Sequence, residues 1–368
     1  MRLAELTTLR VGGDAATVLA PETRDDLVAT MLDVWASGDE WLVVGGGSNL
    51  LIGDDDFEGT VIRTVTRGIE QVPIADAGRE SSAVRLRIQA GESWDELVAY
   101  TVEHRLAGIE ALSGIPGTCG AAPIQNIGAY GQEIAASLVS IEFLDFLTGE
   151  LERIPAAELG LDYRTSTLKQ GREGVVISID IDLEADASGL SSPVAYSQLA
   201  GALGVELSAR VPLEQVRDSV LALRASKGMV LDANDPDSVS AGSFFTNPIV
   251  SENFARSLPA EAPRWLMAPE PVDVVVPLGQ TPPVPTRPEN ASVKLSAAWL
   301  IERSGIHRGF ALPGSRAAVS SKHTLALINR GGANADEISE LARYIQTRVM
   351  AEFGVRLHPE PVLVGVQF

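Results

Sequence analysis

The sequence predicts an α+β fold with two or three domains, and three observations support this prediction. A chain of 368 residues is too long for one ordinary hydrophobic core. Its composition, 45% hydrophobic and 21% charged residues, is that of a globular chain and not of a fibrous or disordered one. Short apolar runs separated by glycine turns dominate the first part of the chain, whereas helical periodicity appears later.

The first part of the chain alternates apolar runs with glycine turns, a pattern typical of strands. We expect strands within 41–52 (WLVVGGGSNLLI), 59–64 and 84–91. Ser93 then begins a helix, because Ser93-Trp-Asp-Glu forms a capping-box pattern and the apolar stripe that follows has a helical period. We expect this helix to end near Gly108.

Two more strands and a helix are expected in the middle of the chain. Segments 138–147 and 174–183 are apolar, and the second is dense in β-branched residues. A helix should begin near Pro212, because proline suits the first helical position and the following residues have the right period.

The texture changes after residue 229, where a polar, turn-rich link begins and a third domain is expected. Nine of the 21 prolines fall between 259 and 288, which excludes a long helix there. Helices are expected within 296–305 and from Asn334 to Phe353. The last helix has capping signals at its start and Gly354 as its stop.

The net charge limits the partners. A formal charge of −20 and a pI near 4.6 disfavour nucleic acid and anionic membranes, because both require a dense basic surface. We therefore expect neither partner. An anionic ligand must find a local cationic pocket.

The low number of cysteines and histidines argues against a disulfide-bonded protein and against a zinc protein. Cys119 is the single cysteine and cannot form an intrachain disulfide, and the four histidines lack zinc-ligand spacing, so we expect no metal site and a reducing, cytoplasmic location. The N-terminus lacks the apolar core of a signal peptide. Residues 111–132 carry no charge, but their glycines, prolines and amides disfavour a membrane helix.

The segment VVGGGSN follows a predicted strand and invites comparison with a dinucleotide-binding turn. It does not fit G-x-G-x-x-G, because Leu50 stands at the third glycine and a strand follows. Three consecutive glycines still let amide groups form a nest for phosphate, with Ser48 and Asn49 as further donors. An ordinary strand turn is the alternative.

The segment 113–134 (SGIPGTCGAAPIQNIGAYGQEI) favours ligand binding over an ordinary turn. Its small residues allow close approach of backbone to a flat ligand, and Gln125 and Asn126 offer amides to heteroatoms. Together the two segments predict a ligand with a diphosphate and a planar heterocycle. The candidate cofactor-binding residues are Gly45, Gly46, Gly47, Ser48, Asn49, Ser113, Gly114, Pro116, Gly117, Gly120, Ala121, Gln125, Asn126, Gly128, Ala129 and Tyr130.

Five blocks in order along the chain resemble a known family. GGGSN, SGIPGTCGAAPIQNIGAYG, LDYRTS, AGSFFTNP and HPEP are similar to the UDP-N-acetylenolpyruvoylglucosamine reductase (MurB) family, over positions 45–360. The resemblance implies an FAD-binding fold of the PCMH or vanillyl-alcohol-oxidase type in two parts, 1–65 and 66–228, with 354–368 returning near the active site. An α/β substrate-binding domain would span 229–353.

The resemblance also implies the reaction. NADPH reduces FAD, the flavin passes hydride to the enolpyruvyl ether of a UDP-sugar, and a protein group protonates the adjacent carbon. This step belongs to peptidoglycan synthesis and therefore to cell-wall growth, cell shape and division. We expect the chain to act as a monomer.

Three residues carry the implied chemistry. Arg164 resembles the arginine that meets the substrate carboxylate, a task suited to its planar fork. Glu360 stands between two prolines that restrict its backbone, and we expect it to be protonated, or to share a proton, when the enolate forms. Ser243 resembles the proton donor, and its role requires fixed orientation. In isolation these would read as a surface ion pair, an exposed acid and the start of a packed strand.

Further residues resemble family positions near the substrate. Lys227 and Asn247 correspond to residues near the diphosphate and the serine, and Tyr196 to the tyrosine of a loop that closes over UDP in the longer, type I subclass. Tyr163 is expected to contact substrate or to pack. His323 stands where some relatives have glutamine.

The chain also departs from the family pattern. The link between Lys227 and Ser243 is longer than in compact members, and the proline-rich stretch 259–288 resembles an insertion. The resemblance therefore does not assign the residues that contact nicotinamide. Cys119 lies in the flavin loop, where a small buried thiol is favoured over a covalent flavin link.

Two other functions remain open at this stage. A flavin oxidase with the same cradle would pass electrons to oxygen and need no NADPH. A UDP-sugar sensor would keep the cradle without catalysis, although the joint presence of Arg164, Ser243 and Glu360 argues against it.

Overall fold

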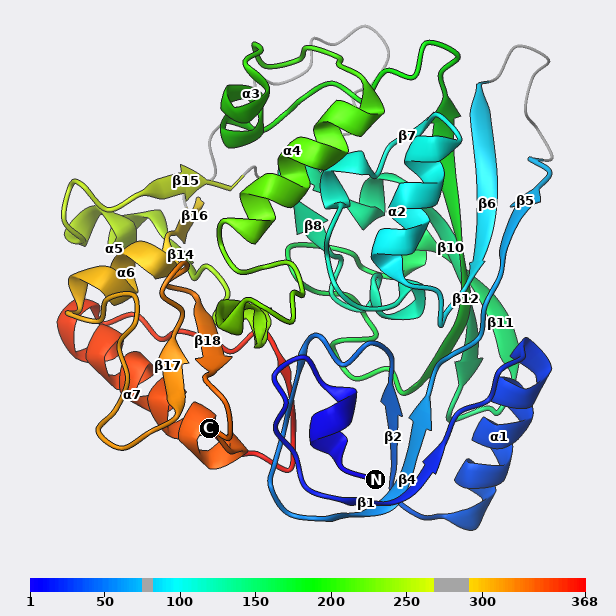
Figure 1. Ribbon diagram of the computed structural model, residues 1–368, viewed down its shortest axis with the longest axis horizontal. Coiled ribbons are helices and arrows are strands. Elements are labelled where there is room, and N and C mark those ends of the chain that lie inside the picture. Colours follow the sequence, from blue (N-terminus) through cyan, green and yellow to red (C-terminus); the bar gives the residue numbers. More distant parts are fainter. Residues whose placement is uncertain (75–81, 268–290) are drawn as a thin grey trace, which may run out of the picture.

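The computed structural model describes residues 1–74, 82–267 and 291–368. Figure 1 shows two groups of elements side by side. The N-terminal sheet and the large antiparallel sheet form one group, and the C-terminal strands with helices α5 to α7 form the other. Within the described residues, no helix has the length and apolar character needed to cross a membrane.

The N-terminal sheet is parallel, with the strand order β1-β4-β2. Helix α1 connects its first two strands in sequence and buries Leu27 and Met31 against Ile62 of this sheet and Val175 of the large sheet. The helix therefore joins the two sheets. The bounds are β1 Ala15–Leu19, α1 Arg24–Ser37, β2 Trp41–Val44 and β4 Phe57–Arg63.

The large sheet is antiparallel, with the order β11-β10-β12-β6-β5 and with β7 paired to β12. Its core is filled by apolar side chains of β6, β10 and β12 packed against helix α2. The bounds are β5 Ile69–Val72, β6 Ala83–Gln89, α2 Trp94–Glu103, β7 Leu106–Ala107, β10 Leu138–Asp145, β11 Leu151–Pro155 and β12 Gly174–Ala185.

Two further helices follow β12 in the chain, and the second of them contacts α2. Helices α3 and α4 pack on each other around Leu199, Val216 and Val220 (Figure 1). The loop that leaves α4 leads into the C-terminal group. The bounds are α3 Ser197–Leu203 and α4 Leu213–Ala225.

The C-terminal group has two three-stranded antiparallel sheets, β13-β18-β17 and β14-β16-β15. The long helix α7 lies against β17 and β18 and buries Ile338, Leu341 and Ile345. The bounds are β13 Ser240–Ser243, β14 Ile249–Ser251, α5 Glu252–Ser257, β15 Arg264–Leu266, β16 Ser292–Leu295, α6 Ala297–Arg303, β17 Ala317–Val319, β18 Ala326–Asn329 and α7 Ala335–Phe353.

The end of the chain crosses back to the first half. Strand β19, Val362–Val364, pairs in parallel with β3, Leu50–Ile52, directly after the glycine-rich turn. A second small pair, β8 Gly128–Ala129 and β9 Gln132–Glu133, lies at the end of the uncharged loop, residues 111–132. Both small pairs lie next to the segments singled out in the sequence.

Most of the expected elements are present, with three differences in detail. The run 41–52 contains two strands in different sheets, because the three glycines turn the chain between them. Helix α2 ends at Glu103 and not near Gly108, and Arg105 then adopts a φ of +58°. The expected capping box at Ser93 is half formed, since Ser93 accepts from the Glu96 amide while the Glu96 carboxylate lies near Arg67.

The proline-rich stretch 259–288 lies only partly within the described residues. Its first part forms β15 after a turn, and residues 268–290 lie outside the described residues. The last helix matches its expectation closely, because Asn334 and Glu337 form a complete capping box and Gly354 ends the helix with a φ of +65°.

The cap at Asn334 gives a stability prediction. Replacing Asn334 with alanine removes the acceptor for the Glu337 amide, so the free energy of unfolding should fall by about 1 kcal/mol. Urea unfolding followed by circular dichroism measures this. Glu340→Ala, at an exposed position of the same helix, is the control and should change the midpoint less. Equal effects of the two substitutions would contradict the capping role.

Candidate active site

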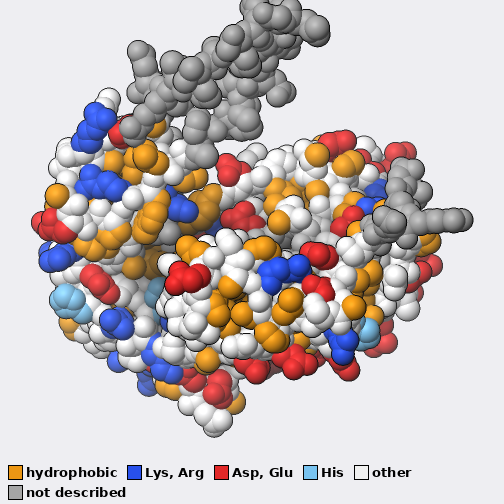
Figure 2. Space-filling view, turned by 90° about the horizontal axis from the view of Figure 1, so that it is seen from above, with side chains coloured by type: hydrophobic (Ala, Val, Ile, Leu, Met, Phe, Trp, Pro, Cys, Tyr) orange, Lys and Arg blue, Asp and Glu red, His pale blue; other side chains and the backbone are white. Residues whose placement is uncertain are grey.

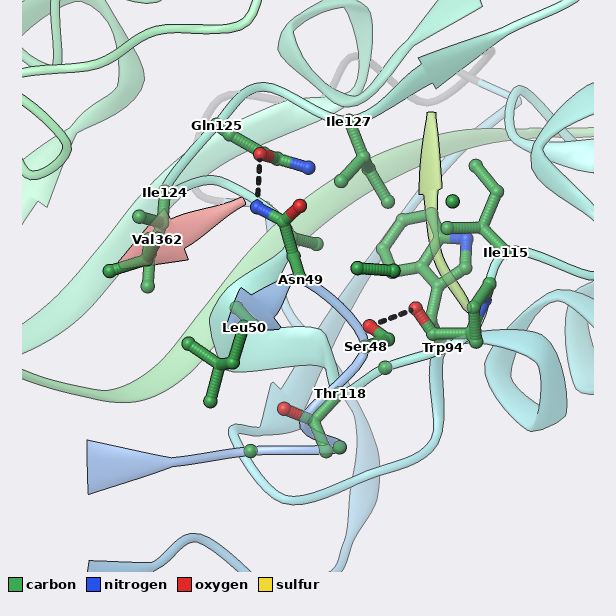
Figure 3. A pocket seen from close by; sticks show the side chains of 18 of the residues that line it. Ser48, Asn49, Leu50, Trp94, Ile115, Thr118, Ile124, Gln125, Ile127 and Val362 are labelled. Atoms are coloured by element: carbon green, nitrogen blue, oxygen red, sulfur yellow. Dashed lines mark hydrogen bonds between the residues drawn. The ribbon is translucent and has the colours of Figure 1, made fainter. Parts of the chain in front are cut away.

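A cavity of about 720 Å³ lies between the two halves of the molecule. Its wall includes residues from the glycine turn, the uncharged loop, the LDYRTS region, the end of α4, β13 and the C-terminal segment. Figure 3 shows Ser48, Asn49, Thr118 and Gln125 converging on this space. The segments that carry the sequence motifs therefore meet around one pocket.

The glycine turn, Gly45 to Gly47, forms one wall of the cavity and packs closely against Gly117 and Leu6. A Cβ at Gly46 would lie 2.7 Å from the Gly117 Cα, and one at Gly47, whose φ is +59°, would lie 1.9 Å from the Leu6 carbonyl oxygen. No larger residue fits these positions without moving backbone. The Ser48 hydroxyl donates to the Pro116 carbonyl at 2.9 Å, which ties the turn to the uncharged loop.

The uncharged loop forms the facing wall. Asn49 Nδ2 donates to Gln125 Oε1 at 2.6 Å across the pocket edge (Figure 3). Asn126 and Tyr130 have φ values of +46° and +48°, a region that non-glycine residues rarely adopt. Backbone strain of this kind concentrates at functional sites.

The three candidate catalytic residues all line the cavity. Glu360 donates its backbone N–H to the Phe244 carbonyl at 2.9 Å, immediately after Ser243. Its carboxylate Oε1 lies 3.3 Å from Arg164 Nε, an ion pair that is not aligned as a hydrogen bond. Ser243 lies 79 residues after Arg164, and Glu360 lies 117 residues after Ser243, so three distant segments bring a guanidinium, a hydroxyl and a carboxyl to one cavity.

Ser243 is held by its neighbours in the strand. Gly242 has a φ of +72°, and Phe244 and Phe245 are each 1% exposed with their rings 5.2 Å apart in an edge-on arrangement. Ser243 itself is half-buried and pairs with Ala326 of β18. The buried rings fix the backbone on one side, while Ser243 forms part of the cavity wall.

Arg164 occupies the tip of a tight turn between Asp162 and Thr165. Its φ is +54°, at a position where such turns usually place glycine or asparagine. Its Nη1 and Nη2 donate to the carbonyl oxygens of Asn126 and Gly128 at 3.2 and 2.7 Å. The guanidinium is thereby aimed across the uncharged loop toward Glu360.

The electrostatics of the cavity oppose the charge of the whole molecule. Burial raises the pKa of Glu360, and the charges of Arg164 and Lys169 lower it less. Burial lowers the pKa of Arg224 to about 10, so this guanidinium stays charged at neutral pH. A cationic lining is present inside a chain of net charge −20. Figure 2 shows acidic side chains spread over one outer face, with basic ones among them.

A second group of candidates gathers around Lys227. Its Nζ lies over the Tyr130 ring, 5.4 Å from the centroid, and donates a hydrogen bond to Gln198 Oε1 at 2.9 Å. Tyr196 stacks edge-on against Tyr130, with centroids 5.9 Å apart. Burial and the charge of Lys227 lower the pKa of His323 to about 4, so its imidazole is neutral at neutral pH.

Five predicted residues are not part of the cavity wall, and their contacts explain why. The Ser113 hydroxyl donates to Glu110, and the Gly114 amide donates to Asp95. The Asn126 side chain bonds Glu133 and Ala135, although its carbonyl supports Arg164. Lys294 lies over the Tyr163 ring, and Asn247 accepts from the Ala297 amide at the start of α6.

The sequence reasoning missed several residues of the wall. Lys169 and Arg224 line the cavity as cations, and Gln198 holds Lys227. Thr118 Oγ1 is buried without a hydrogen-bond partner, and so is Arg224 Nε. The position of Lys169 five residues after Arg164, and that of Arg224 three before Lys227, were the available signals. Cys119 is fully buried and, as favoured, packs as a thiol in the core.

Comparison with known proteins places this site in a family. An FAD binding domain matches residues 15–155, and the C-terminal domain of UDP-N-acetylenolpyruvoylglucosamine reductase matches residues 235–364. A UDP-N-acetylenolpyruvoylglucosamine reductase from Leifsonia xyli is 60% identical, with 99% of this chain and 98% of the relative covered. One from Thermobifida fusca is 46% identical over 99% and 97%.

The chain belongs to the UDP-N-acetylenolpyruvoylglucosamine reductase family. A crystal structure of the reductase from Thermus caldophilus superposes with a TM-score of 0.61 at 25% identity, covering 99% of this chain and 97% of that one. The α+β fold with a flavin-binding part and a separate C-terminal part is thereby confirmed.

The residues of the cavity fit the FAD expected of this family. Gly45, Gly46, Gly47 and Gly117 line the cavity, so a ligand there lies against backbone without side chains. The unpartnered Thr118 hydroxyl offers a hydrogen bond to such a ligand. Ser48, Asn49, Gln125 and the backbone of 116–121 are the groups that would hold the cofactor.

The close approach at Gly46 predicts a flavin-binding defect. Gly46→Ala pushes the two loops apart, because its Cβ meets backbone and not a flexible side chain. The purified variant should carry less bound FAD, with affinity reduced at least ~10-fold, the equivalent of about 1.4 kcal/mol. The visible flavin spectrum after gel filtration measures this. Gly201→Ala in α3, where an added Cβ meets nothing within 4 Å, is the control. Wild-type flavin content in Gly46→Ala would contradict the cradle.

Proposed function

We propose that this protein reduces the enolpyruvyl ether of UDP-N-acetylglucosamine to UDP-N-acetylmuramate, with NADPH as the reductant, and that Arg164, Ser243 and Glu360 act on the substrate. The convergence of these three residues on one cavity carries the proposal. Membership of the family supports the reaction. The chemistry that bound FAD would supply, after reduction by NADPH, is a hydride for the vinyl carbon.

Arg164 binds and polarises the carboxylate of the enolpyruvyl group. Hydride addition leaves negative charge on the adjacent carbon and its carboxylate, and a guanidinium close by stabilises that charge. Arg164 suits this role because its side chain is 22% exposed and its Nε lacks a hydrogen-bond partner. The strained turn under it fixes the direction of the guanidinium.

Ser243 donates the proton to the adjacent carbon. A hydroxyl is a weak acid, so its contribution depends on orientation and on nearby cations. The buried Phe244 and Phe245 hold its backbone, and the hydrogen bond from Glu360 N–H to Phe244 holds it against the C-terminal segment.

Glu360 acts in its protonated form. Its side chain is 13% exposed, and burial raises its pKa. A neutral carboxyl can donate a hydrogen bond to the developing carboxylate, whereas an ionised one would repel it. The two flanking prolines, Pro359 and Pro361, restrict the backbone that carries this group.

The second set of candidates forms the nucleotide side of the site. Lys227, Tyr196 and His323 line the cavity near one another, and we assign them to the UDP diphosphate and sugar. Tyr163 and Asn247 lie outside the cavity wall, where Tyr163 contacts Lys294 and Asn247 accepts from the Ala297 amide at the start of α6. We further propose that the protein acts as a cytoplasmic monomer, in keeping with its acidic surface and single buried thiol.

Loss of the Ser243 hydroxyl should separate the two half-reactions. In Ser243→Ala, NADPH should still bleach the flavin, while reoxidation by the enolpyruvyl substrate slows at least ~10²-fold. Stopped-flow absorbance of the flavin measures both steps. Ser226→Ala, which removes an exposed hydroxyl at the end of α4, is the control. Near-normal reoxidation would remove Ser243 from the role of proton donor.

Arg164→Lys should impair turnover and leave FAD in place. Lysine keeps the charge but loses the planar fork that holds two carbonyl groups and faces Glu360, so kcat/KM for the enolpyruvyl substrate should fall at least ~10-fold. Steady-state NADPH consumption and flavin content measure the two effects. Arg153→Lys, at an ion pair with Asp180 outside the cavity wall, is the control. Loss of FAD from Arg164→Lys would show that Arg164 belongs to the cofactor site.

The oxidase alternative has its own test. Consumption of NADPH by the wild-type protein without the enolpyruvyl substrate would favour an oxidase.

A further inference from the structure

Lys169 lies at the point where three segments of the cavity wall meet. Its Nζ lies 3.1 Å from the backbone carbonyl oxygen of Glu360 and 3.4 Å from Gln125 Oε1. The sequence reasoning assigned it no role. Its ammonium nevertheless connects the segment after Arg164, the uncharged loop and the C-terminal segment.

The base of Lys169 is itself anchored to the uncharged loop. Its backbone N–H donates to the Ser166 hydroxyl at 3.2 Å, and that hydroxyl, on a fully buried residue, donates to the Ile124 carbonyl. The side chain therefore projects from a fixed point toward Glu360. A flexible surface lysine has no such anchor.

The backbone around Glu360 is held from opposite sides. Its N–H donates to Phe244 next to Ser243, and its carbonyl accepts from Lys169 and, at 3.4 Å, from Asn49 Nδ2. Pro359 and Pro361 have no N–H to add to this set. The peptide planes on both sides of Glu360 are thus set by these few contacts, and they aim its carboxyl.

The charges of the group are coupled as well. Glu360 faces the two cations Arg164 and Lys169, which lower its pKa against the burial that raises it. Burial lowers the pKa of Lys169, while the charge of Glu360 raises it and that of Arg164 lowers it. Lys169 therefore influences both the position of Glu360 and its proton.

We propose that Lys169 is a positioning residue for the reduction. It clamps the Glu360 turn to the flavin-binding loop through the Glu360 carbonyl and Gln125, so that the Glu360 carboxyl and the Arg164 guanidinium meet the same substrate carboxylate. This inference rests on the proposed function. A purely structural role, the alternative, would affect folding and flavin retention but neither the pH profile nor one half-reaction alone.

Lys169→Met tests the clamp, since methionine keeps much of the volume and loses the donors. Flavin content and the rate of flavin reduction by NADPH should stay within about twofold of wild type. Reoxidation by the enolpyruvyl substrate should slow about 10- to 100-fold, the scale of a hydrogen bond from a charged donor. Lys322→Met, which removes an ammonium paired with Asp235 outside the cavity wall, is the matched control and should leave both rates unchanged.

The pH profile supplies the second readout. Removal of the Lys169 charge raises the pKa of Glu360 further, because one of its two cationic neighbours is gone. If protonated Glu360 is the active form, reoxidation is lost as pH rises through that pKa, so this alkaline limb should move to higher pH in Lys169→Met. Lys169→Arg keeps the charge and should restore the wild-type limb with part of the rate.

The outcomes separate this inference from the proposed function. Wild-type flavin that NADPH bleaches but the enolpyruvyl substrate does not restore would refute the proposed function itself. With that activity present, an unchanged reoxidation rate and pH limb in Lys169→Met would overturn the positioning role. Loss of flavin or of thermal stability with no change in the pH limb would do the same. Should Lys169→Met fail to fold, Lys169→Gln, which keeps a neutral donor, carries the same comparison.

Discussion

The C-terminal segment 358–362 is hydrogen-bonded to both halves of the molecule, and the active-site arrangement depends on this contact. On one side Phe245 pairs with Pro359 and the Thr246 amide donates to His358. On the other side the Val362 amide donates to Asn49, directly after the glycine turn. A few backbone hydrogen bonds thus set the distance between the serine strand and the flavin cradle.

This contact explains how the chain brings distant residues together without a large interface. Backbone hydrogen bonds are directional, and the contacts on both sides involve paired strands: Phe244, which accepts from the Glu360 N–H, directly follows β13, and Val362 begins β19. Glu360 lies between these anchors. Its side chain is therefore placed by the pairing on both sides and not by its own contacts alone.

The cavity is cationic although the chain is strongly acidic. Arg164, Lys169, Arg224 and Lys227 line it, and burial lowers the pKa of Lys169, of Lys227 and of Arg224. Charges that are partly buried interact with an anionic ligand more strongly than charges in bulk water do. The same burial makes these positive charges unfavourable when no anionic ligand is bound. An acidic ligand such as a nucleotide diphosphate compensates that unfavourable burial, which links binding to the electrostatics of the cavity.

The sequence predicts those features whose signals are local. Helix α7 has its cap, periodicity and stop within 21 residues, 334–354, and its ends were predicted correctly. The end of α2 was not, because the chain leaves the helix at Glu103 to form β7, a pairing with the distant β12. Lys169 was missed for a related reason. Its role depends on contacts with Gln125 and Glu360, and burial is a property of the fold that spacing does not encode.

The site combines features that the rest of the fold must stabilise. Arg164 holds a φ of +54°, a conformation that costs of the order of 1–3 kcal/mol for a non-glycine residue, and Glu360 is a buried acid whose pKa is raised. Both are fixed by hydrogen bonds to backbone of neighbouring loops. In the proposed mechanism, a substrate carboxylate bound at Arg164 would add negative charge beside Glu360 and raise the pKa of Glu360 further. Substrate binding would then favour the protonated Glu360 carboxyl that the proposed mechanism requires.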